Sequence, residues 1–233
     1  MSKLRKENLK EGSILCLKNA KSLLEDAELL IKKKSYGHAK FLIISAIEET
    51  NKAFLLASPI TNYQEIRKDI REHGKKIFPF ILFRFAKSND KYLANLTTEI
   101  LHKESSIKNE FISSITEFSK SMNQATEETY ESRMRGLYVD YESERWISPF
   151  DISKKDVSEL FKLAKEYFEY FHKLCNAIFS AQQDQVRSAY AVACNIQASV
   201  VEYLFENKII SKEVYETIKS NIKEDAEKIQ EIK

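Results

Sequence analysis

Glycine and proline are scarce in this chain, with 4 Gly and 3 Pro among 233 residues. These residues mark turns and interrupt helices, so their scarcity predicts few, long helices. The three cysteines, Cys16, Cys175 and Cys194, are scattered and odd in number. This usage predicts buried free thiols in a reducing compartment instead of a disulfide framework. No apolar run reaches the roughly 18 residues that span a bilayer, and the first residues do not lead into a secretory segment. We therefore expect a cytoplasmic protein without a membrane partner.

An excess of charge of one sign is also missing, because 37 basic residues face 35 acidic ones and the net charge is +2. This balance is not that of a dedicated nucleic-acid binder, although it is compatible with a local basic patch. The sequence has no Gly-rich phosphate loop, no Cys-x-x-Cys and no His-Glu-x-x-His motif, and it supports no nucleophilic triad. These absences argue against the common classes of metabolic enzyme. We expect no cofactor and no metal ion.

Apolar residues recur at helical spacing along most of the chain, which predicts an all-α protein, a multi-helix bundle. The expected helices cover 8–33, 37–57, a segment beginning near 63, one or two helices within 89–131, 154–181, 182–206, and a last helix that Ser211 caps. Residues 133–149 are different, because short aromatic and β-branched runs predict a loop or a short hairpin there. We expect residues 1–181 to form the main helical domain and residues 182–233 a C-terminal helical extension packed on it.

Polar side chains interrupt the apolar helix expected at 41–56, where Glu48, Glu49 and Lys52 follow Ile44. Helical spacing places Glu48 on the same face as Ile44, and Glu49 and Lys52 on the neighbouring face. A buried carboxylate must be paired or hydrogen-bonded, because burying it alone costs several kcal/mol or neutralises it. The pattern therefore predicts a buried polar site with partners elsewhere in the chain. The other interpretation is an i,i+3 ion pair on a solvated helix face.

A histidine, His73, lies in the middle of a stripe of isoleucines, with Arg67 and Lys76 nearby in the sequence. One interpretation is a core histidine whose hydrogen bonds are satisfied. The other is an imidazole beside a carboxylate of the preceding helix, which would set its tautomer and its pKa for proton transfer.

The segment after residue 132 brings Arg135, Tyr138 and Asp140 close together in sequence. In an extended strand Tyr138 and Asp140 point to the same side. An arginine and a tyrosine beside a carboxylate can grip a phosphate. They can also anchor the loop to the helices, in which case Arg135 or Lys52 would neutralise the two adjacent glutamates.

A fourth pattern imitates the ligand set of a di-iron carboxylate bundle. It consists of Glu99-x-x-His102 and Glu169-x-x-His172, with Glu48 or Glu49 and Glu127 or Glu128 from two other helices. The helical phase does not fit, because Glu169 points almost opposite to the expected core face of its helix. Metal ligands must converge inside the bundle, so the di-iron protein is a remote alternative.

These motifs, taken in order, resemble the AbiV family of abortive-infection proteins, which are grouped with the HEPN superfamily. The residues that carry the resemblance are Tyr36-Gly37-x-Ala39, Glu48-Glu49-x-x-Lys52, His73-x-Lys75-Lys76, Arg135-Gly136-Leu137-Tyr138-Val139-Asp140-Tyr141 and Trp146-x-x-Pro149. The resemblance implies an all-α bundle, a homodimer, and a role in shutting down a phage-infected cell at the level of RNA or translation. It leaves room for a phage protein as the activator.

Many HEPN proteins are metal-independent ribonucleases marked by Arg-x4–6-His, and Arg67-x5-His73 has this spacing. The resemblance thus implies a metal-independent endoribonuclease in which His73 acts as general base or acid on a ribose 2′-hydroxyl. Glu48 or Glu49 would orient the imidazole, and Arg135, with Lys76 or Arg67, would stabilise the charge on the phosphorane. The expected substrate-binding residues are Lys52, Arg67, Lys76, Tyr138 and Asp140. The alternative is a non-catalytic effector in which the same residues fix the helices and the exposed surface binds a protein.

Overall fold

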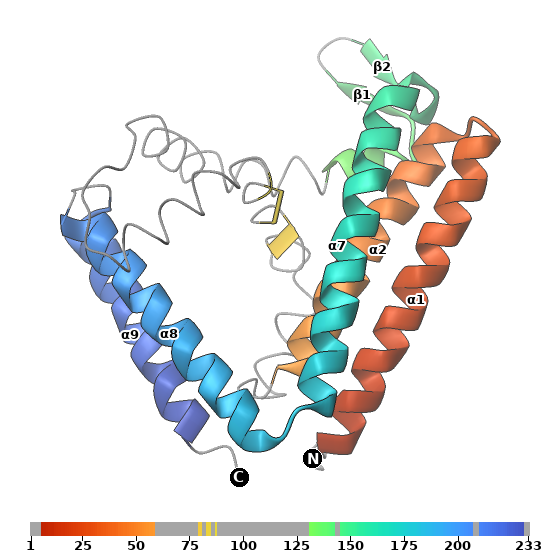
Figure 1. The fold of residues 1–233 in the computed structure, drawn as a ribbon. Helices are drawn as coiled ribbons and strands as arrows, with labels where there is room; N and C mark the ends of the chain where they lie inside the picture. The colour runs from red at the N-terminus through yellow and green to blue at the C-terminus, as the bar shows by residue number, and fades with distance from the viewer. Residues whose placement is uncertain are drawn as a thin grey trace, which may run out of the picture. The chain divides into compact units, whose positions relative to one another are not determined.

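The described residues form long helices and one short β-hairpin (Figure 1). The computed structural model describes residues 6–58, 79–80, 83–84, 87, 131–142, 145–206 and 210–230. Its elements are α1 (Lys6–Lys32), α2 (Tyr36–Ala57), β1 (Asp140–Glu142), β2 (Arg145–Ile147), the 3-10 turn η1 (Pro149–Asp151), α7 (Lys154–Ser180), α8 (Gln183–Glu206) and α9 (Lys212–Gln230). The predicted all-α fold with a short hairpin is confirmed. The helices expected from 63 onward and within 89–130 lie outside the described residues.

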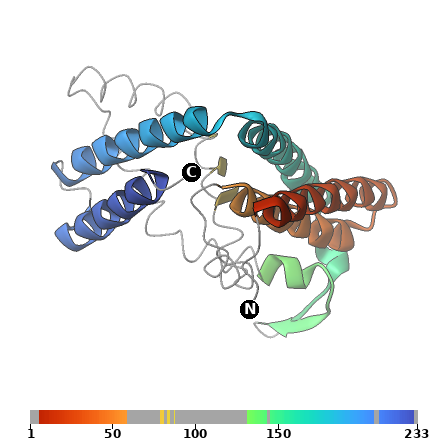
Figure 2. The same ribbon diagram turned by 90° about the horizontal axis from the view of Figure 1, so that it is seen from below.

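The chain divides into two compact units. The first unit contains α1, α2, the hairpin and α7, and the second contains α8 and α9, which lie side by side in Figure 2. The second stretch of the first unit ends at Phe179, two residues before the end of the main domain expected from the sequence. Packing of the C-terminal extension on the first unit stays a prediction. No helix among the described residues is long and apolar enough to cross a membrane.

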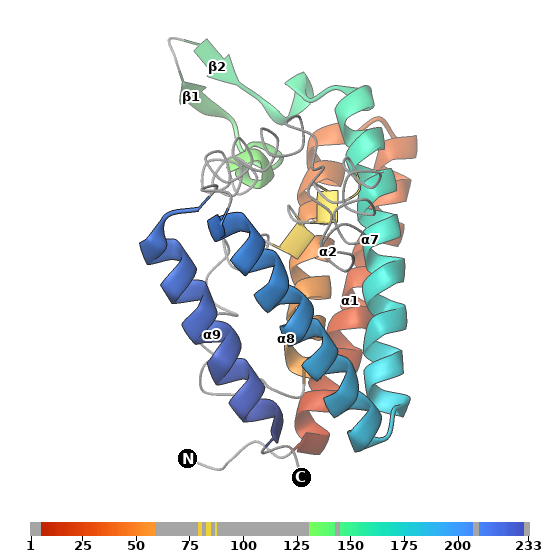
Figure 3. The same ribbon diagram turned by 60° about the vertical axis from the view of Figure 1, so that its left-hand side comes forward.

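The core of the first unit lies among α1, α2 and α7, which run side by side in Figures 1 and 3. Its buried residues come from all three helices and include Leu24, Ala27, Ile43, Ile47, Val157, Ala164 and Tyr167. The rings of Phe80 and Phe83 meet Tyr167 edge to face, with centroids 5.2 and 5.1 Å away. Burial of such aromatic and aliphatic side chains is the main force that holds these helices together.

The turn between α1 and α2 closes α1 with a left-handed residue, Lys34, whose φ is 61°. The backbone N–H of Lys34 donates to the carbonyl of Ile31 at 3.0 Å, and that of Ser35 donates to Leu30 at 2.9 Å. This pair of bonds is the Schellman arrangement, in which glycine is the usual left-handed residue. A serine also caps α7, since the Ser153 hydroxyl accepts from the N–H of Asp156 at 3.2 Å.

The hairpin begins later than the sequence indicated. Residues 131–135 are still helical, and the antiparallel strands pair Tyr141 with Trp146 only further on. Arg135 forms an i,i+4 ion pair with Glu131 at 3.5 Å, which supports the last helical turn. The turn ends where the N–H of Gly136 donates to the carbonyl of Arg133 at 3.1 Å. The expectation of non-helical structure from residue 133 is therefore wrong by three residues.

Two glycines and a proline bring the base of the hairpin against the start of α2. A Cβ atom on Gly37 would lie 2.5 Å from Cβ of Pro149 and 2.6 Å from its carbonyl oxygen. A Cβ atom on Gly136 would lie 2.6 Å from the carbonyl oxygen of Gly37. Three segments distant in sequence thus meet at backbone contact, which only residues without a side chain allow at these positions.

In the described part of the second unit, α8 and α9 pack against each other. The rings of Phe205 and Tyr215 stack with centroids 4.3 Å apart, and the Tyr215 hydroxyl donates to Glu202 at 2.9 Å. Ser211 caps α9 as predicted, because its hydroxyl accepts from the N–H of Val214 at 3.3 Å.

Candidate functional site

A buried ion pair joins α2 to the helical turn before the hairpin. Nη1 of Arg133 lies 2.7 Å from Oε1 of Glu48, and the two side chains are 17% and 7% exposed. The guanidinium also covers the ring of Phe41, with its carbon 4.9 Å from the ring centroid. Charges this buried lose most of their hydration, so each depends on the other for compensation. The predicted burial of Glu48 is present, and its partner is an arginine 85 residues away.

Sequence analysis selected Arg135 in this segment and missed Arg133. The sequence indicates non-helical structure from residue 133, but residues 131–135 are helical. Two residues apart on a helix means a rotation of about 200°, so Arg133 and Arg135 point to nearly opposite sides. Arg133 faces Glu48, and Arg135 pairs with Glu131. If residues 131–135 are expected to be helical, Arg133 and Arg135 fall on opposite sides of the helix, and only one of them can face Glu48.

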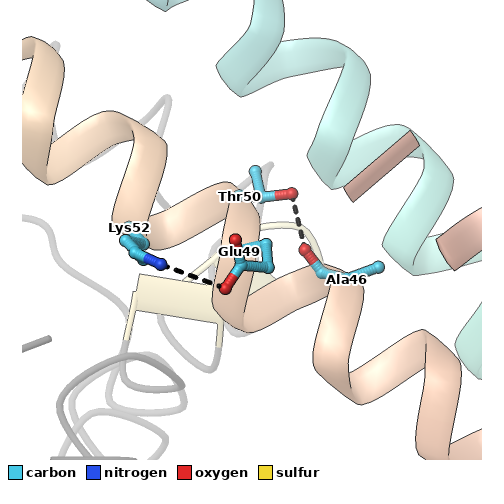
Figure 4. Close-up of polar contacts among 4 residues, drawn as sticks. All are labelled: Ala46, Glu49, Thr50 and Lys52. Carbon is cyan, nitrogen blue, oxygen red and sulfur yellow. Dashed lines mark hydrogen bonds and ion pairs between the residues drawn. The ribbon is translucent and has the colours of Figure 1, made fainter. Parts of the chain in front are cut away.

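Glu49 and Lys52 form a second, more exposed pair on α2. Nζ of Lys52 lies 3.4 Å from Oε1 of Glu49, with side-chain exposures of 30% and 23% (Figure 4). On the same helix, the Thr50 hydroxyl donates to the carbonyl of Ala46 at 2.8 Å. The i,i+3 ion pair is as the sequence suggested, whereas the two glutamates differ in burial. Of the two, Glu49 is the carboxylate that keeps contact with solvent.

The thiol of Cys16 lies beside this exposed pair. Burial, together with the neighbouring charge of Glu49, raises the pKa of Cys16 to about 11. Burial likewise raises the pKa of Cys175 to about 11. Both thiols are therefore protonated near neutral pH, which removes them as nucleophiles. All three cysteines are buried and free, as predicted.

One helical turn after Glu48, Asn51 ties α2 to α7. The hydroxyl of Tyr167 donates to Oδ1 of Asn51, and both residues are fully buried. Burial raises the pKa of Tyr167 far above its usual value, so the phenol stays protonated and remains a donor. The polar residues of α2 thus connect different neighbours, with Glu48 holding residue 133 and Asn51 holding α7.

Replacing Tyr167 with phenylalanine should lower the free energy of unfolding by about 1–2 kcal/mol, because the buried hydrogen bond to Asn51 is lost while the ring packing stays. Urea unfolding followed by circular dichroism measures the change. Tyr170, whose side chain is mostly exposed, provides the matched control. A Tyr170→Phe variant as unstable as Tyr167→Phe would contradict the assignment of the loss to the buried bond.

Lys40 is a half-buried cation that sequence analysis did not select. Burial lowers the pKa of Lys40, the nearby charge of Arg135 lowers it further, and Asp156 opposes both. Lys40 on α2 therefore lies near Asp156, at the beginning of α7, and near Arg135, which is paired with Glu131. The sequence signal for Lys40 is a basic residue in the mostly apolar first half of α2, four positions before the buried Ile44.

Several predicted site residues either lie away from the Glu48–Arg133 pair or lie outside the described residues. His73, Arg67 and Lys76 lie outside the described residues, and their roles stay predictions. Tyr138 is 59% exposed, and Asp140 is the first residue of β1, paired with Ile147. Tyr138 precedes the strand, so the expectation that both residues belong to one extended strand is wrong. The strand begins only at Asp140 because the chain is helical up to residue 135.

Metal binding finds no support among the residues that the structure describes, where no group of three His, Cys, Asp or Glu side chains could hold an ion. Glu169 and His172 are exposed, and the imidazole stacks on Phe168 with centroids 5.5 Å apart. This pair therefore points away from the bundle interior that a di-iron centre would occupy. The other residues of that pattern, Glu99, His102, Glu127 and Glu128, lie outside the described residues.

The fold and the site define an α-helical bundle whose second helix carries buried polar residues and holds a β-hairpin at one end. The model of the HEPN_AbiV family, described as AbiV, matches residues 8–169, more than half of the chain, so the chain belongs to the AbiV family. Membership in this HEPN family of abortive-infection proteins implies a role in phage defence. Comparisons with curated proteins and with solved structures found no match.

Proposed function

We propose that the chain shuts down the infected cell as an endoribonuclease that needs no metal ion. The observation that carries the proposal is the extent of the family match. Residues 8–169 contain every site residue that the sequence predicted, and the match ends before α8. The chemistry of this family is therefore expected in the first unit, in the part of the chain that contains Arg67 and His73.

In the proposed reaction His73 takes the proton of a ribose 2′-hydroxyl, whose oxygen attacks the adjacent phosphorus. The bond to the 5′ oxygen breaks, that oxygen receives a proton, and a 2′,3′-cyclic phosphate remains. Glu48 or Glu49 orients the imidazole in this proposal; Glu48 is paired with Arg133 in the bundle, and Glu49 is paired with Lys52 and keeps contact with solvent. Arg135, with Lys76 or Arg67, supports the negative charge of the phosphorane in this proposal.

A specific observation also favours a second function, that of a non-catalytic effector which binds the translation machinery or a phage protein. The Glu48–Arg133 and Tyr167–Asn51 contacts are buried and join three segments of the first unit. Buried polar networks of this kind fix one arrangement of helices. On this alternative the polar residues of α2 are structural, and the exposed surface performs the function.

The test is incubation of the purified, metal-chelated full chain with total tRNA and rRNA, with analysis of the fragment ends. The nuclease predicts specific fragments with cyclic phosphate ends, and a His73→Ala variant should lose cleavage while its helical circular dichroism stays unchanged. His172→Ala is the matched control, because His172 is an exposed histidine on α7. Intact RNA with folded wild-type protein would favour the effector, and equal cleavage by His73→Ala would contradict the role given to His73.

A further inference from the structure

The β-hairpin presents aromatic side chains to solvent. Tyr141 on β1 and Trp146 on β2 are directly opposite each other, and their rings meet edge to face with centroids 5.2 Å apart. Opposite residues of an antiparallel pair lie on the same face, so both rings project from one side of the hairpin. Trp146 is 71% exposed and Tyr141 56%. Exposed rings of this kind are surfaces on which a planar group can stack.

Three further exposed residues lie at the base of the hairpin. Tyr138 and Val139 come just before β1, and Phe150 comes three residues after β2. Because β1 begins opposite the end of β2, these residues belong to the same end of the hairpin. We call Tyr138, Val139, Tyr141, Trp146 and Phe150 the hairpin patch, and each is more than half exposed. At about 200 Å² for a whole aromatic side chain, its four rings expose on the order of 500 Å², a size at which apolar surface usually has a function.

The turn between α1 and α2 adds positive charge at the same end of the first unit. It contains Lys32, Lys33 and Lys34, all exposed, and we call it the basic turn. Lys32 is paired with Glu28 at 3.3 Å on α1. Lys33 and Lys34 form no ion pair with another described residue. Two of the three lysines can therefore contact an anionic partner without first giving up a carboxylate.

The basic turn is connected to the base of the hairpin. Gly37, three residues after the turn, packs against Pro149, which precedes Phe150. The turn lies at the hairpin end of the bundle in Figure 1. Lys34 also has the left-handed φ of 61°, at a position where glycine is the usual residue. A lysine stands there despite its conformational cost, which favours a role for its charge.

The charges around the patch determine how an anionic polymer can lie on it. Residues 140–151 are acidic in sequence, with four carboxylates against one arginine. Phosphates are therefore expected at the basic turn, and the hairpin is expected to contact bases, whose flat faces carry no charge. The residues between the two strands, Ser143 and Glu144, are polar, whereas a hairpin that inserts into a membrane needs apolar side chains there. Exposed rings beside lysines are the combination with which proteins bind unpaired nucleic acid.

We propose that the hairpin patch and the basic turn bind unpaired RNA, with bases stacked on the exposed rings and phosphates on Lys33 and Lys34. The inference names the substrate class of the first unit, and it rests on the ribonuclease proposed above. Bases inside a double helix are stacked on each other, so the rings select unpaired loops and ends. The packing of Gly37 against Pro149 keeps the rings and the lysines close together, so that one short strand reaches both.

Trp146 is the only tryptophan, so its emission reports binding at the hairpin patch. The probe is an oligouridine of about ten nucleotides, with 2′-O-methyl riboses that block the attacking hydroxyl and prevent cleavage. It should quench Trp146, and Phe150→Ser should raise the dissociation constant about tenfold or more, as loss of one stacked base does. Phe150 is 89% exposed, so the melting temperature should stay near that of the wild type. Leu15→Ser, which removes a mostly exposed apolar side chain from α1, is the matched control.

Lysine replacements test the phosphate contacts. Lys34→Gly removes the charge and supplies the residue that suits the left-handed turn, so the melting temperature should not fall. Binding should weaken all the same, and the slope of log affinity against log salt should decrease in magnitude by about 0.7, the value for one phosphate contact on a single strand. Lys33→Gln should act alike. Lys18→Gln, at an exposed position about four helical turns earlier, is the matched control and should leave binding unchanged.

A folded wild-type protein that does not bind the probe would overturn this proposal, as would equal affinity of Phe150→Ser and the wild type. A response of Trp146 to phosphatidylglycerol vesicles and not to the probe would also overturn it, in favour of a lipid surface. Cleavage of natural RNA tests the ribonuclease separately. Cleavage without any effect of Phe150→Ser on probe binding would keep the ribonuclease and remove the RNA surface. Probe binding that is lost in Phe150→Ser and Lys34→Gly, without cleavage, would keep the surface and contradict the ribonuclease.

Discussion

Replacing Glu48 with alanine should lower the free energy of unfolding by about 3–5 kcal/mol, the typical loss when one partner of a buried ion pair is removed. Arg133 would keep its place over Phe41 and lose the carboxylate 2.7 Å away. Its charge would then be buried without the compensation that Glu48 provides. Urea unfolding followed by circular dichroism at 222 nm, with a linear extrapolation to water, gives the change.

Glu49→Ala is the matched control, because it removes a glutamate from the next position of the same helix. The Glu49–Lys52 pair is partly exposed, so its removal should cost no more than about 1 kcal/mol. Joint replacement by Glu48→Met and Arg133→Met should recover most of the stability, since apolar residues of similar size often replace a buried pair without loss. Equal losses for Glu48→Ala and Glu49→Ala would contradict the burial argument.

The double replacement also separates structure from chemistry. A folded Glu48→Met, Arg133→Met protein that still cleaves RNA would show that Glu48 positions the turn before the hairpin and takes no part in proton transfer. A folded double variant without RNA cleavage would support a catalytic role for Glu48.

Replacing Gly37 with alanine should destabilise the first unit by about 1–3 kcal/mol or more, the usual range for inserting a methyl group into packed surroundings. The new Cβ would lie 2.5 Å from Cβ of Pro149 and 2.6 Å from its carbonyl oxygen. A proline ring and a backbone carbonyl cannot turn aside as a flexible side chain does. The hairpin base must therefore move, and the emission of Trp146 should change in the folded protein. Thermal unfolding and tryptophan fluorescence measure the two effects.

Gly12→Ala makes the same chemical change at a position where we expect a gain in stability instead of a loss. Among the residues that the structure describes, its Cβ would meet only Cδ1 of Leu56, at 3.4 Å, which is an ordinary contact. Glycine inside a helix costs about 0.5–1 kcal/mol relative to alanine, so this variant should be slightly more stable than the wild type. If Gly12→Ala and Gly37→Ala had the same effect, the contact with Pro149 would not be the cause.

The helices could be predicted from sequence because helical spacing of apolar residues depends on local order alone. The expected helix at 37–57 corresponds to α2 (Tyr36–Ala57), and that at 154–181 to α7 (Lys154–Ser180). The burial of Glu48 followed from the same spacing, since Ile44 one turn earlier is also buried. Periodicity gives the buried face of a helix without any knowledge of its neighbours.

The partners across the fold could not be obtained in this way. Arg133 was missed because the choice between it and Arg135 depends on whether residues 131–135 are helical, and their aromatic, β-branched continuation argued for extended structure. The role of Gly37 and Gly136 was missed because it depends on an approach to Pro149 that no local pattern encodes. The exposed rings of the hairpin were visible as aromatic composition, but their common face depends on the register of β1 and β2.

The attachment of Arg133 to α2 has a consequence for local opening. Its guanidinium lies over Phe41 and beside Glu48, two helical turns apart on the same helix. Unwinding residues 131–135 alone would withdraw the arginine and leave a bare carboxylate inside the bundle. This makes separate opening of that turn costly, so it is expected to open together with α2. The surface segment at the base of the hairpin should then resist hydrogen exchange and proteases almost as strongly as the helical core.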